Sequence, residues 1–316
     1  MTGLDGSDSN NPQSEIRIAQ SGEALMPREL ILGPTSHYFY SQRLKLHYVD
    51  WGNADKPPLL LIHGGRDHAR NWDWVATALR HDYHIIAPDL RGHGDSQWAV
   101  SGAYAMIDYV LDVVQLLNAV KLFPITVIGH SLGGSIALQY SGVYPDRVRK
   151  VVAIEGLGPP PSMLRDTPAQ QRMTAWIGEM QALAQRHPRR YKSLDEAVER
   201  MRDANPHLSP QQAHHLTIHG SYRDEDGTYL WKFDNYVRAA SPYLFNMNEA
   251  RDIWGQITCP VLLVRGTESW ASDPEIDGRA TAFRSYKAIN IEKAGHWVHH
   301  DQLDEFLKVV RSFLSD

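Results

Sequence analysis

The chain has 316 residues, of which 42% are hydrophobic and 22% are charged, a composition typical of a globular protein. A formal net charge of −5 and the lack of a long basic run argue against nucleic acid or an anionic membrane as the main partner. The single cysteine, Cys259, excludes an intramolecular disulfide, and a chain of this length buries a substantial core without one.

The first 25 residues are polar and rich in Asp, Ser and Asn. They lack the basic and apolar regions of a secretory signal, so we expect a flexible N-terminal arm over residues 1–25. No apolar run approaches the length of a membrane span. Together with the lone cysteine, these features predict a cytoplasmic protein.

From Tyr38 onward, apolar runs of strand length alternate with helical patterns. This order is typical of an α/β fold, in which helices flank a mostly parallel sheet of eight strands. Strands are predicted over residues 38–40, 44–51, 58–63, 84–88, 125–129, 148–154, 261–265 and 288–292. Helices are predicted over residues 71–79, 107–120 and 302–313, and a further helix begins at Ser131.

The alternation of strands and helices stops between residues 157 and 255. This stretch opens with three consecutive prolines, at positions 159–161, and contains helical patterns over 173–186 and 194–202. We expect it to form a helical lid, or cap, inserted into a core domain made of residues 26–156 and 256–316.

A candidate nucleophile lies between a predicted strand and a predicted helix. Gly129-His130-Ser131-Leu132-Gly133 matches the pattern G-x-S-x-G, in which the serine occupies a sharp, strained turn. Neighbours two residues away on either side of such a turn must be small, and both are glycine here. The helix that follows directs its N–H groups at the serine and favours developing negative charge.

Three further motifs, taken with this turn, resemble the α/β-hydrolase superfamily from about Tyr38 to the C-terminus. They are HGG at residues 63–65, DLRGHGDS at 89–96 and AGHW at 294–297. The resemblance implies Ser131 as nucleophile, His296 as the catalytic base, and the backbone N–H groups of Gly65 and Leu132 as the oxyanion hole. The stretch EGLGP at 155–159 is most similar to serum-hydrolase-like members of the superfamily.

Other histidines lie close to these candidates. His299 and His300 are expected at the surface or facing the lid, and His130 is expected to point away from the nucleophile. A metal site in this His-rich stretch is disfavoured, because no second cluster with ligand spacing accompanies it in the sequence.

The triad acid is displaced from its usual place in the superfamily. The position where most members carry an aspartate holds Ser269, and a serine does not stabilise an imidazolium as a carboxylate does. The alternatives are Glu155, just after the predicted strand 148–154, and Glu268. We favour Glu155, because a carboxylate at the end of a buried strand is costly unless it is paired. Asp273 and Asp277 are expected to be surface residues.

A serine nucleophile argues against haloalkane dehalogenases and epoxide hydrolases, which use an aspartate at this position. The resemblance implies hydrolysis of small-molecule esters of small to medium acyl chain through an acyl-enzyme, without a cofactor. One alternative is a C–C bond hydrolase acting on a diketone, in which Arg189-Arg190 or His214-His215 would polarise the carbonyl. The other two are a perhydrolase and a binding protein without catalytic activity. Oligomeric state stays open. Part of the aromatic and thioether set of the lid is expected to line an acyl pocket: Trp176, Tyr191, Met201, Tyr222, Tyr229, Trp231, Tyr236, Tyr243 and Phe245.

Overall fold

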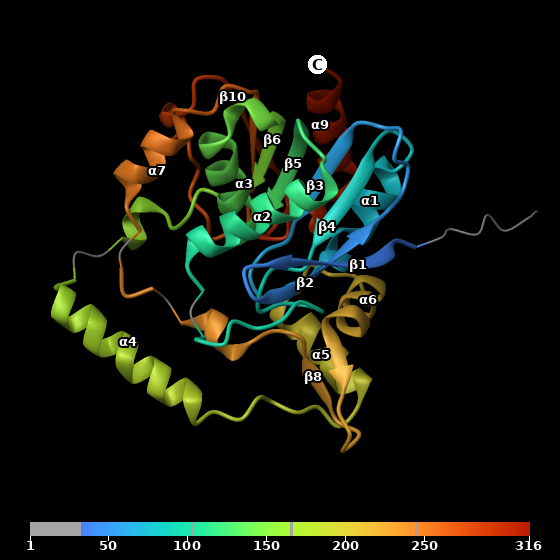
Figure 1. Cartoon of the computed structure of the whole chain (residues 1–316), viewed down its shortest axis with the longest axis vertical. Coiled ribbons are helices and arrows are strands. Elements are labelled where there is room, and N and C mark those ends of the chain that lie inside the picture. Colours follow the sequence, from blue (N-terminus) through green and yellow to red (C-terminus); the bar gives the residue numbers. More distant parts are fainter. Residues whose placement is uncertain (1–32, 103, 165–166, 240, 244) are drawn as a thin grey trace, which may run out of the picture. The chain divides into compact units, whose positions relative to one another are not determined.

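An eight-stranded sheet forms the core of the computed structural model, which describes residues 33–316 apart from 103, 165–166, 240 and 244 (Figure 1). The strand order is β1-β2-β4-β3-β5-β6-β9-β10; β2 is antiparallel to both of its neighbours and the other pairs are parallel. The predicted α/β fold with a mostly parallel sheet is therefore confirmed, whereas the arm predicted for residues 1–25 lies outside the described residues. The strands are β1 (Thr35–Ser41), β2 (Leu44–Asp50), β3 (Pro58–Ile62), β4 (His84–Pro88), β5 (Ile125–His130), β6 (Val148–Ile154), β9 (Val261–Gly266) and β10 (Tyr286–Ile291).

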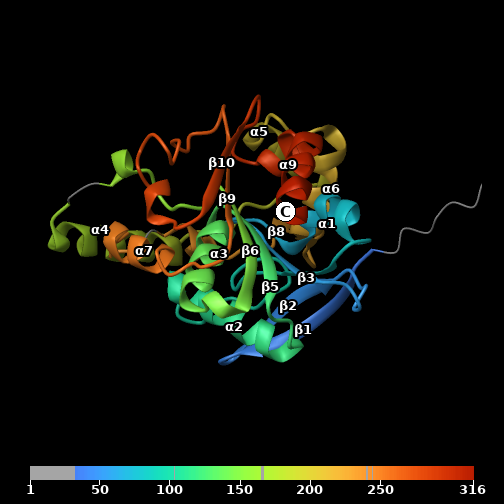
Figure 2. The same cartoon turned by 90° about the horizontal axis from the view of Figure 1, so that it is seen from above.

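Helices cover both faces of this sheet. On one face lie α2 (Met106–Val120), α3 (Leu132–Val143) and α7 (Met247–Trp254), and on the other lie α1 (Asp73–Leu79) and α9 (Leu303–Ser315) (Figures 1 and 2). Short helical turns join these elements: η1 (Ala69–Trp72), η2 (Pro145–Arg147), η3 (Pro161–Met163), η4 (Asn235–Arg238), η5 (Ala280–Ala282) and α8 (Val298–Asp301).

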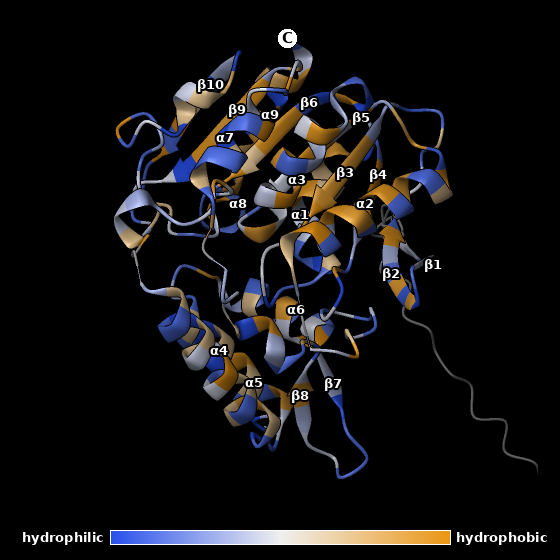
Figure 3. Cartoon of the chain, turned by 60° about the vertical axis from the view of Figure 1, so that its left-hand side comes forward, coloured by the Kyte–Doolittle hydropathy of each residue, from blue (hydrophilic) through white to orange (hydrophobic). Residues whose placement is uncertain are grey.

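The central strands are continuous apolar runs because both of their faces are covered. Successive side chains of β3 alternate between the two hydrophobic cores. Leu60 and Ile62 pack with α2 and α3, whereas Leu59 and Leu61 pack with α1 and α9. The central strands accordingly appear as a hydrophobic band in Figure 3.

Residues 157–246, hereafter the insertion, lie between β6 and α7 in the chain. They contain α4 (Ala169–Ala184), α5 (Leu194–Ala204), α6 (Pro210–Gly220) and a hairpin of β7 (Ser221–Arg223) and β8 (Tyr229–Trp231). The side chain of Ser193 caps α5, and a capping box of Ser209 with Gln212 begins α6. The elements α5, α6 and the hairpin lie together at one end of the sheet (Figures 1 and 3).

Two features of this region differ from the sequence-based expectation. The hairpin was not expected, because each of its strands is three residues long. Helix α7 falls within the range 157–255, yet Ala250 and Trp254 are buried in the same core as α3, so this helix covers the sheet. No helix among the described residues is long and apolar enough to cross a membrane.

Candidate active site

Ser131 lies on a sharp turn between β5 and α3. Its backbone has φ +52° and ψ −116°, a conformation that residues with a side chain rarely adopt. The turn is held by a hydrogen bond of 2.8 Å from Ser131 N to the carbonyl of Ile154 on β6. A Cβ atom on Gly129 would lie 2.2 Å from the carbonyl oxygen of Gly133, and one on Gly133 would lie 2.2 Å from that of Ile62. Both glycines are therefore required sterically, as the motif predicts.

A second close approach joins the start of α3 to the residues after β6. A Cβ atom on Gly134 would lie 2.7 Å from the Cα atom of Gly156, and the Ser135 hydroxyl donates to the Gly156 carbonyl at 2.7 Å. This contact brings the segment that contains Glu155 next to the serine turn.

His296 and Glu155 form a hydrogen-bonded pair. The Nδ1 atom of His296, in the turn after β10, lies 2.5 Å from Oε2 of Glu155. The Glu155 side chain is fully buried, and its carboxylate also accepts from Gly266 N at 3.0 Å and from the Ser269 hydroxyl at 2.6 Å. Three donors thus satisfy the buried carboxylate. Because Nδ1 donates its proton to Glu155, the other ring nitrogen, Nε2, is left as a proton acceptor.

The other candidate acids lie elsewhere. Glu268 is about half exposed, and its carboxylate lies 3.6 Å from Nε2 of His207. Asp277 forms an ion pair of 2.8 Å with Arg279, and Asp273 accepts a hydrogen bond from Asn290. Ser269, at the position where an aspartate was expected, contributes through its hydrogen bond to Glu155.

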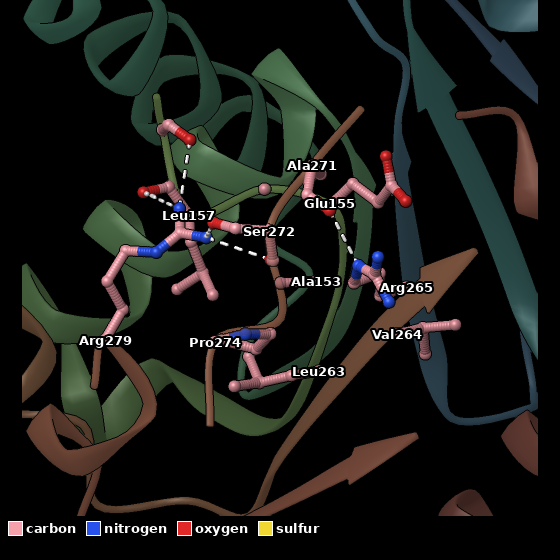
Figure 4. A pocket seen from close by; sticks show the side chains of 12 residues that line it. Ala153, Glu155, Leu157, Leu263, Val264, Arg265, Ala271, Ser272, Pro274 and Arg279 are labelled. Atoms are coloured by element: carbon pink, nitrogen blue, oxygen red, sulfur yellow. Dashed lines mark hydrogen bonds between the residues drawn. The ribbon is translucent and has the colours of Figure 1, made fainter. Parts of the chain in front are cut away.

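A buried arginine ties together the two segments that meet at Glu155. Arg279 is 2% exposed and donates to the carbonyls of Leu157 at 3.4 Å and Gly158 at 3.2 Å, just after Glu155 (Figure 4). The same guanidinium donates at 3.0 Å to the hydroxyl of Ser272, three residues after Ser269. The turn that holds the carboxylate and the loop that holds its serine donor are therefore fixed against each other.

Ser131 and His296 line a cavity of about 820 Å³ between the carboxyl ends of the strands and the insertion. Gly65 and Leu132, the residues expected to supply the oxyanion hole, line the same cavity. Leu132 is the first residue of α3, so its N–H group has no carbonyl partner within the helix. No hydrogen bond of the Ser131 hydroxyl occurs among the described residues, which leaves it able to turn toward the imidazole.

The turn that carries Gly65 is fixed by a neutral histidine. His63 Nε2 accepts from the backbone N–H of Leu90 at 3.0 Å, and its Nδ1 donates to the carbonyl of Gly64 at 2.7 Å. Complete burial lowers the pKa of His63 to about 3, so the ring stays neutral and keeps both roles. A Cβ atom on Gly64 would lie 2.8 Å from the ring of His130, which explains the small residue there.

Asp89, the first residue of the DLRGHGDS motif, organises the neighbouring loop. Its carboxylate accepts hydrogen bonds from His47 Nδ1 at 2.7 Å, Ala69 N at 2.7 Å and Asp95 N at 2.9 Å. Burial alone would raise the pKa of Asp89, but the hydrogen bond and charge of His47 hold it well below its usual range. Gly94 has φ +54°, and a Cβ atom there would lie 2.1 Å from the Asp89 carboxyl carbon.

The expectation that His299 and His300 lie at the surface is wrong for both, but His300 does face the lid, since its carbonyl accepts a hydrogen bond from Gln212 of α6 at 3.1 Å. His299 and His300 are 0% and 5% exposed, respectively. His299 bonds to Asn71 at 2.6 Å and stacks on Trp72 with ring centroids 4.6 Å apart, so partners far away in the sequence bury it. Neither forms a hydrogen bond with Ser131 among the described residues.

His130 is buried next to the nucleophile. Its Nε2 donates to the backbone carbonyl of His296 at 2.9 Å, which fixes the turn that carries the candidate base. Burial lowers the pKa of His130 well below that of a free histidine, so the ring is neutral.

A group with metal-ligand chemistry lies where α1 meets α6. Ligand atoms of Asp73, His215 and His219 lie within 4.8 Å of one another. Arg70 already donates to both carboxylate oxygens of Asp73, at 2.9 and 2.8 Å, and His215 Nε2 lies 3.0 Å from the same carboxylate. This ion-pair network already supplies hydrogen-bond donors to the Asp73 carboxylate.

Among the lid residues expected in the acyl pocket, Tyr191, Met201 and Trp231 line the cavity. Apart from the proposed catalytic and oxyanion-hole residues and Arg189, the rest of the wall was not expected from the sequence. Trp270, from the loop after β9, lines the cavity with its ring centroid 5.1 Å from that of His296. Five arginines also line it: Arg66, Arg186, Arg189, Arg200 and Arg238.

A serine on a strained strand-to-helix turn and a buried histidine–glutamate pair, at the carboxyl edge of a mostly parallel sheet, define a hydrolase of the α/β class. A family model described as alpha/beta hydrolase fold matches residues 57–303, and the chain belongs to that family.

Two of the relatives are named as a hydrolase and an esterase. A serine hydrolase-like protein of Danio rerio is 27% identical over 273 residues, which cover 84% of this chain and 83% of that protein. An esterase of Mycobacterium tuberculosis is 28% identical over 303 residues, covering 89% of this chain and 90% of that one. A hypothetical protein of Pseudomonas aeruginosa PAO1 has a solved structure with the same fold, at a TM-score of 0.79 and 24% identity, covering 89% of this chain and 99% of that one.

Proposed function

We propose that the protein hydrolyses carboxylic esters of small to medium acyl chain through an acyl-enzyme on Ser131. The observation that carries the proposal is the hydrogen bond of 2.5 Å between His296 Nδ1 and the buried carboxylate of Glu155, at the cavity that Ser131 also lines. The relatives named esterase and serine hydrolase support the same activity.

The first half-reaction forms the acyl-enzyme. His296 Nε2 takes the proton of the Ser131 hydroxyl as the oxygen attacks the ester carbonyl. The carbonyl oxygen becomes an oxyanion, which the N–H groups of Gly65 and Leu132 stabilise by hydrogen bonding. The intermediate collapses by breaking the bond to the alcohol oxygen, which leaves with the proton from His296.

In the second half-reaction, His296 removes a proton from water, and the resulting hydroxide attacks the acyl carbon. The proton then returns to Ser131 as the acid departs. Throughout both steps, Glu155 stabilises the imidazolium and holds the ring orientation. Every proton transfer in this cycle uses side chains of the chain itself.

The proposal is tested by turnover of p-nitrophenyl acetate and p-nitrophenyl butyrate by the purified protein and by Ser131→Ala. We expect the substitution to lower kcat by at least about 10³-fold, because the nucleophile is lost. A fluorophosphonate should add its mass once to the wild-type chain and not to Ser131→Ala. Equal turnover by both proteins would exclude Ser131 as the nucleophile.

The C–C bond hydrolase remains the second candidate. One observation favours it: Arg189, which the sequence suggested as a carbonyl-polarising group, lines the cavity. Arg190 instead pairs with Asp224 and Asp226, and His215 pairs with Asp73. Release of a carboxylic acid from a 1,3-diketone, with no turnover of esters, would favour this alternative.

We also propose a cytoplasmic location. The buried thiol of Cys259, whose pKa is raised by burial to about 11, has no partner cysteine in the sequence and supports a reducing compartment.

A further inference from the structure

The cavity next to Ser131 carries a concentration of positive charge. The arginine cluster, defined as Arg66, Arg186, Arg189, Arg200 and Arg238, lines it together with the catalytic candidates. No aspartate or glutamate is among the described residues that line this cavity. Because the chain as a whole has a net charge of −5, the cluster is a local feature and does not follow from the overall composition.

Four arginines pair with carboxylates among the described residues, and none of them belongs to the cluster: Arg70, Arg91, Arg190 and Arg279. Among the described residues, none of its five members forms an ion pair with a carboxylate. Arg190, adjacent in the sequence to Arg189, pairs with Asp224 at 2.5 Å and Asp226 at 2.9 Å. The buried Arg91 likewise pairs with Asp112 at 2.7 Å.

Two members of the cluster are held by aromatic rings. The guanidinium carbon of Arg189 lies 5.0 Å from the ring centroid of Tyr191, and that of Arg238 lies 5.1 Å from the ring centroid of Phe233. A ring that contacts the flat face of a guanidinium leaves the N–H donors at its rim available, in the planar arrangement that suits a carboxylate or a phosphate. Tyr191 and Phe233 also line the cavity, so these donors lie at its wall.

Members of the cluster are close enough to affect one another. Burial, and then the positive charges of Arg66, Arg186 and Arg200, lower the pKa of Arg238. Guanidinium groups stay protonated in proteins, so their mutual repulsion is relieved by a bound anion.

We propose that the arginine cluster binds an anionic group, a carboxylate or a phosphate, on a part of the substrate away from the scissile bond. The proposal rests on the function proposed above and narrows its substrate class to organic esters that carry a second, negatively charged end. A volume of about 820 Å³ accommodates such a molecule, and Trp231 and Trp270 line the same cavity as apolar surface for its carbon chain. Arg66 directly follows Gly65, so the cluster begins at the predicted oxyanion hole.

A matched pair of substrates tests the proposal. Mono-p-nitrophenyl adipate and p-nitrophenyl hexanoate share the leaving group and the chain length, and only the first has a terminal carboxylate. We expect kcat/KM of the wild-type protein to be at least about tenfold higher for the adipate ester than for the hexanoate ester at low ionic strength. This is the preference expected from two solvent-screened interactions between guanidinium groups and the terminal carboxylate. The preference should shrink in 0.5 M NaCl, because salt screens the guanidinium groups.

The double variant Arg200→Gln, Arg238→Gln should lower the adipate-to-hexanoate ratio at least about tenfold, and its thermal unfolding midpoint reports whether it is folded. Arg190→Gln is the matched control, because Arg190 is neutralised by two aspartates and does not line the cavity. The control should keep the wild-type ratio. A wild-type ratio near one, or a double variant that is folded and keeps the full preference, would overturn the proposal.

Binding to Ser131→Ala separates the anion site from the ester chemistry. Calorimetry with adipate and with glycerol phosphate should show binding of at least one that is lost in the triple variant with Arg200→Gln and Arg238→Gln. Tighter binding of glycerol phosphate assigns a phosphate, and tighter binding of adipate assigns a carboxylate. Anion binding without turnover of either ester would retain the anion site and exclude the ester hydrolase. Absence of binding for both anions would overturn the site itself.

Discussion

Replacing Glu155 by glutamine is the most informative change to the proposed machinery. The amide has the shape of the carboxylate but lacks its charge, and one of its two heteroatoms becomes a donor. In the native site Oε1 accepts from Gly266 N, while Oε2 accepts from both His296 Nδ1 and the Ser269 hydroxyl. If the amide oxygen keeps the bond to Gly266, its NH₂ group faces His296 and favours the tautomer with the proton on Nε2. That tautomer does not accept the proton of Ser131.

If the amide instead turns its oxygen toward His296, its NH₂ group faces the N–H of Gly266, and two buried donors oppose each other. In either orientation the imidazolium formed in the transition state loses the carboxylate. We expect kcat to fall by about 10³–10⁴-fold, equivalent to about 4–5.5 kcal/mol, with little change in KM.

The assay is turnover of p-nitrophenyl butyrate, with Glu268→Gln as the matched control. Glu268 is about half exposed and pairs only distantly with His207, so its replacement should change kcat less than about twofold. The double variant Glu155→Gln, Ser269→Asp restores a carboxylate next to the imidazole and should recover at least about tenfold of the lost kcat. A Glu155→Gln protein that turns over at the wild-type rate would refute the assignment.

Two further predictions concern the scaffold. Gly133→Ala places a methyl group against a backbone carbonyl and should lower the free energy of unfolding, measured by urea titration, by about 3 kcal/mol or more. The control Gly178→Ala, in α4, adds a methyl group in open space and should cause no loss of stability. Equal effects of the two substitutions would contradict the steric argument. Burial lowers the pKa of His63 to about 3, of His93 to about 4 and of His300 to about 3, so below the unfolded value near 6.5 only the unfolded chain binds these protons. Stability should therefore fall from pH 6 to pH 5 by about 1.2 kcal/mol for each histidine, and an unchanged urea midpoint over that interval would count against their burial as neutral rings.

Much of the fold was predictable because its signals are local. The strands from β3 to β6 are apolar runs bounded by turn residues, and the glycines around Ser131 are required by contacts within a few residues and with one neighbouring strand. The hairpin of β7 and β8 was not predictable from periodicity, because three residues do not establish an alternation.

The features that depend on distant partners were harder to predict. His299 looks like a surface residue in the sequence, and its burial depends on Asn71 and Trp72, far away in the chain. The sequence left two glutamates as candidates for the triad acid. Only the folded structure places Glu155 beside His296, which lies 141 residues further along the chain. Of the arginine cluster, only Arg189 was singled out from the sequence, because the members come from separate segments that the fold brings to one cavity.

Two residues of the proposed machinery, Ser131 and Glu155, have positive φ angles of 52° and 51°. For residues with a side chain, this conformation costs about 1 kcal/mol or more at each position, and glycine would relieve it. Selection for stability alone would therefore replace both residues by glycine, and only selection for activity opposes that drift. Glu155→Gly removes the carboxylate that orients the base and its three hydrogen bonds, and it relieves the backbone strain at this position. The balance between these two quantities measures how much stability the fold sacrifices for catalysis.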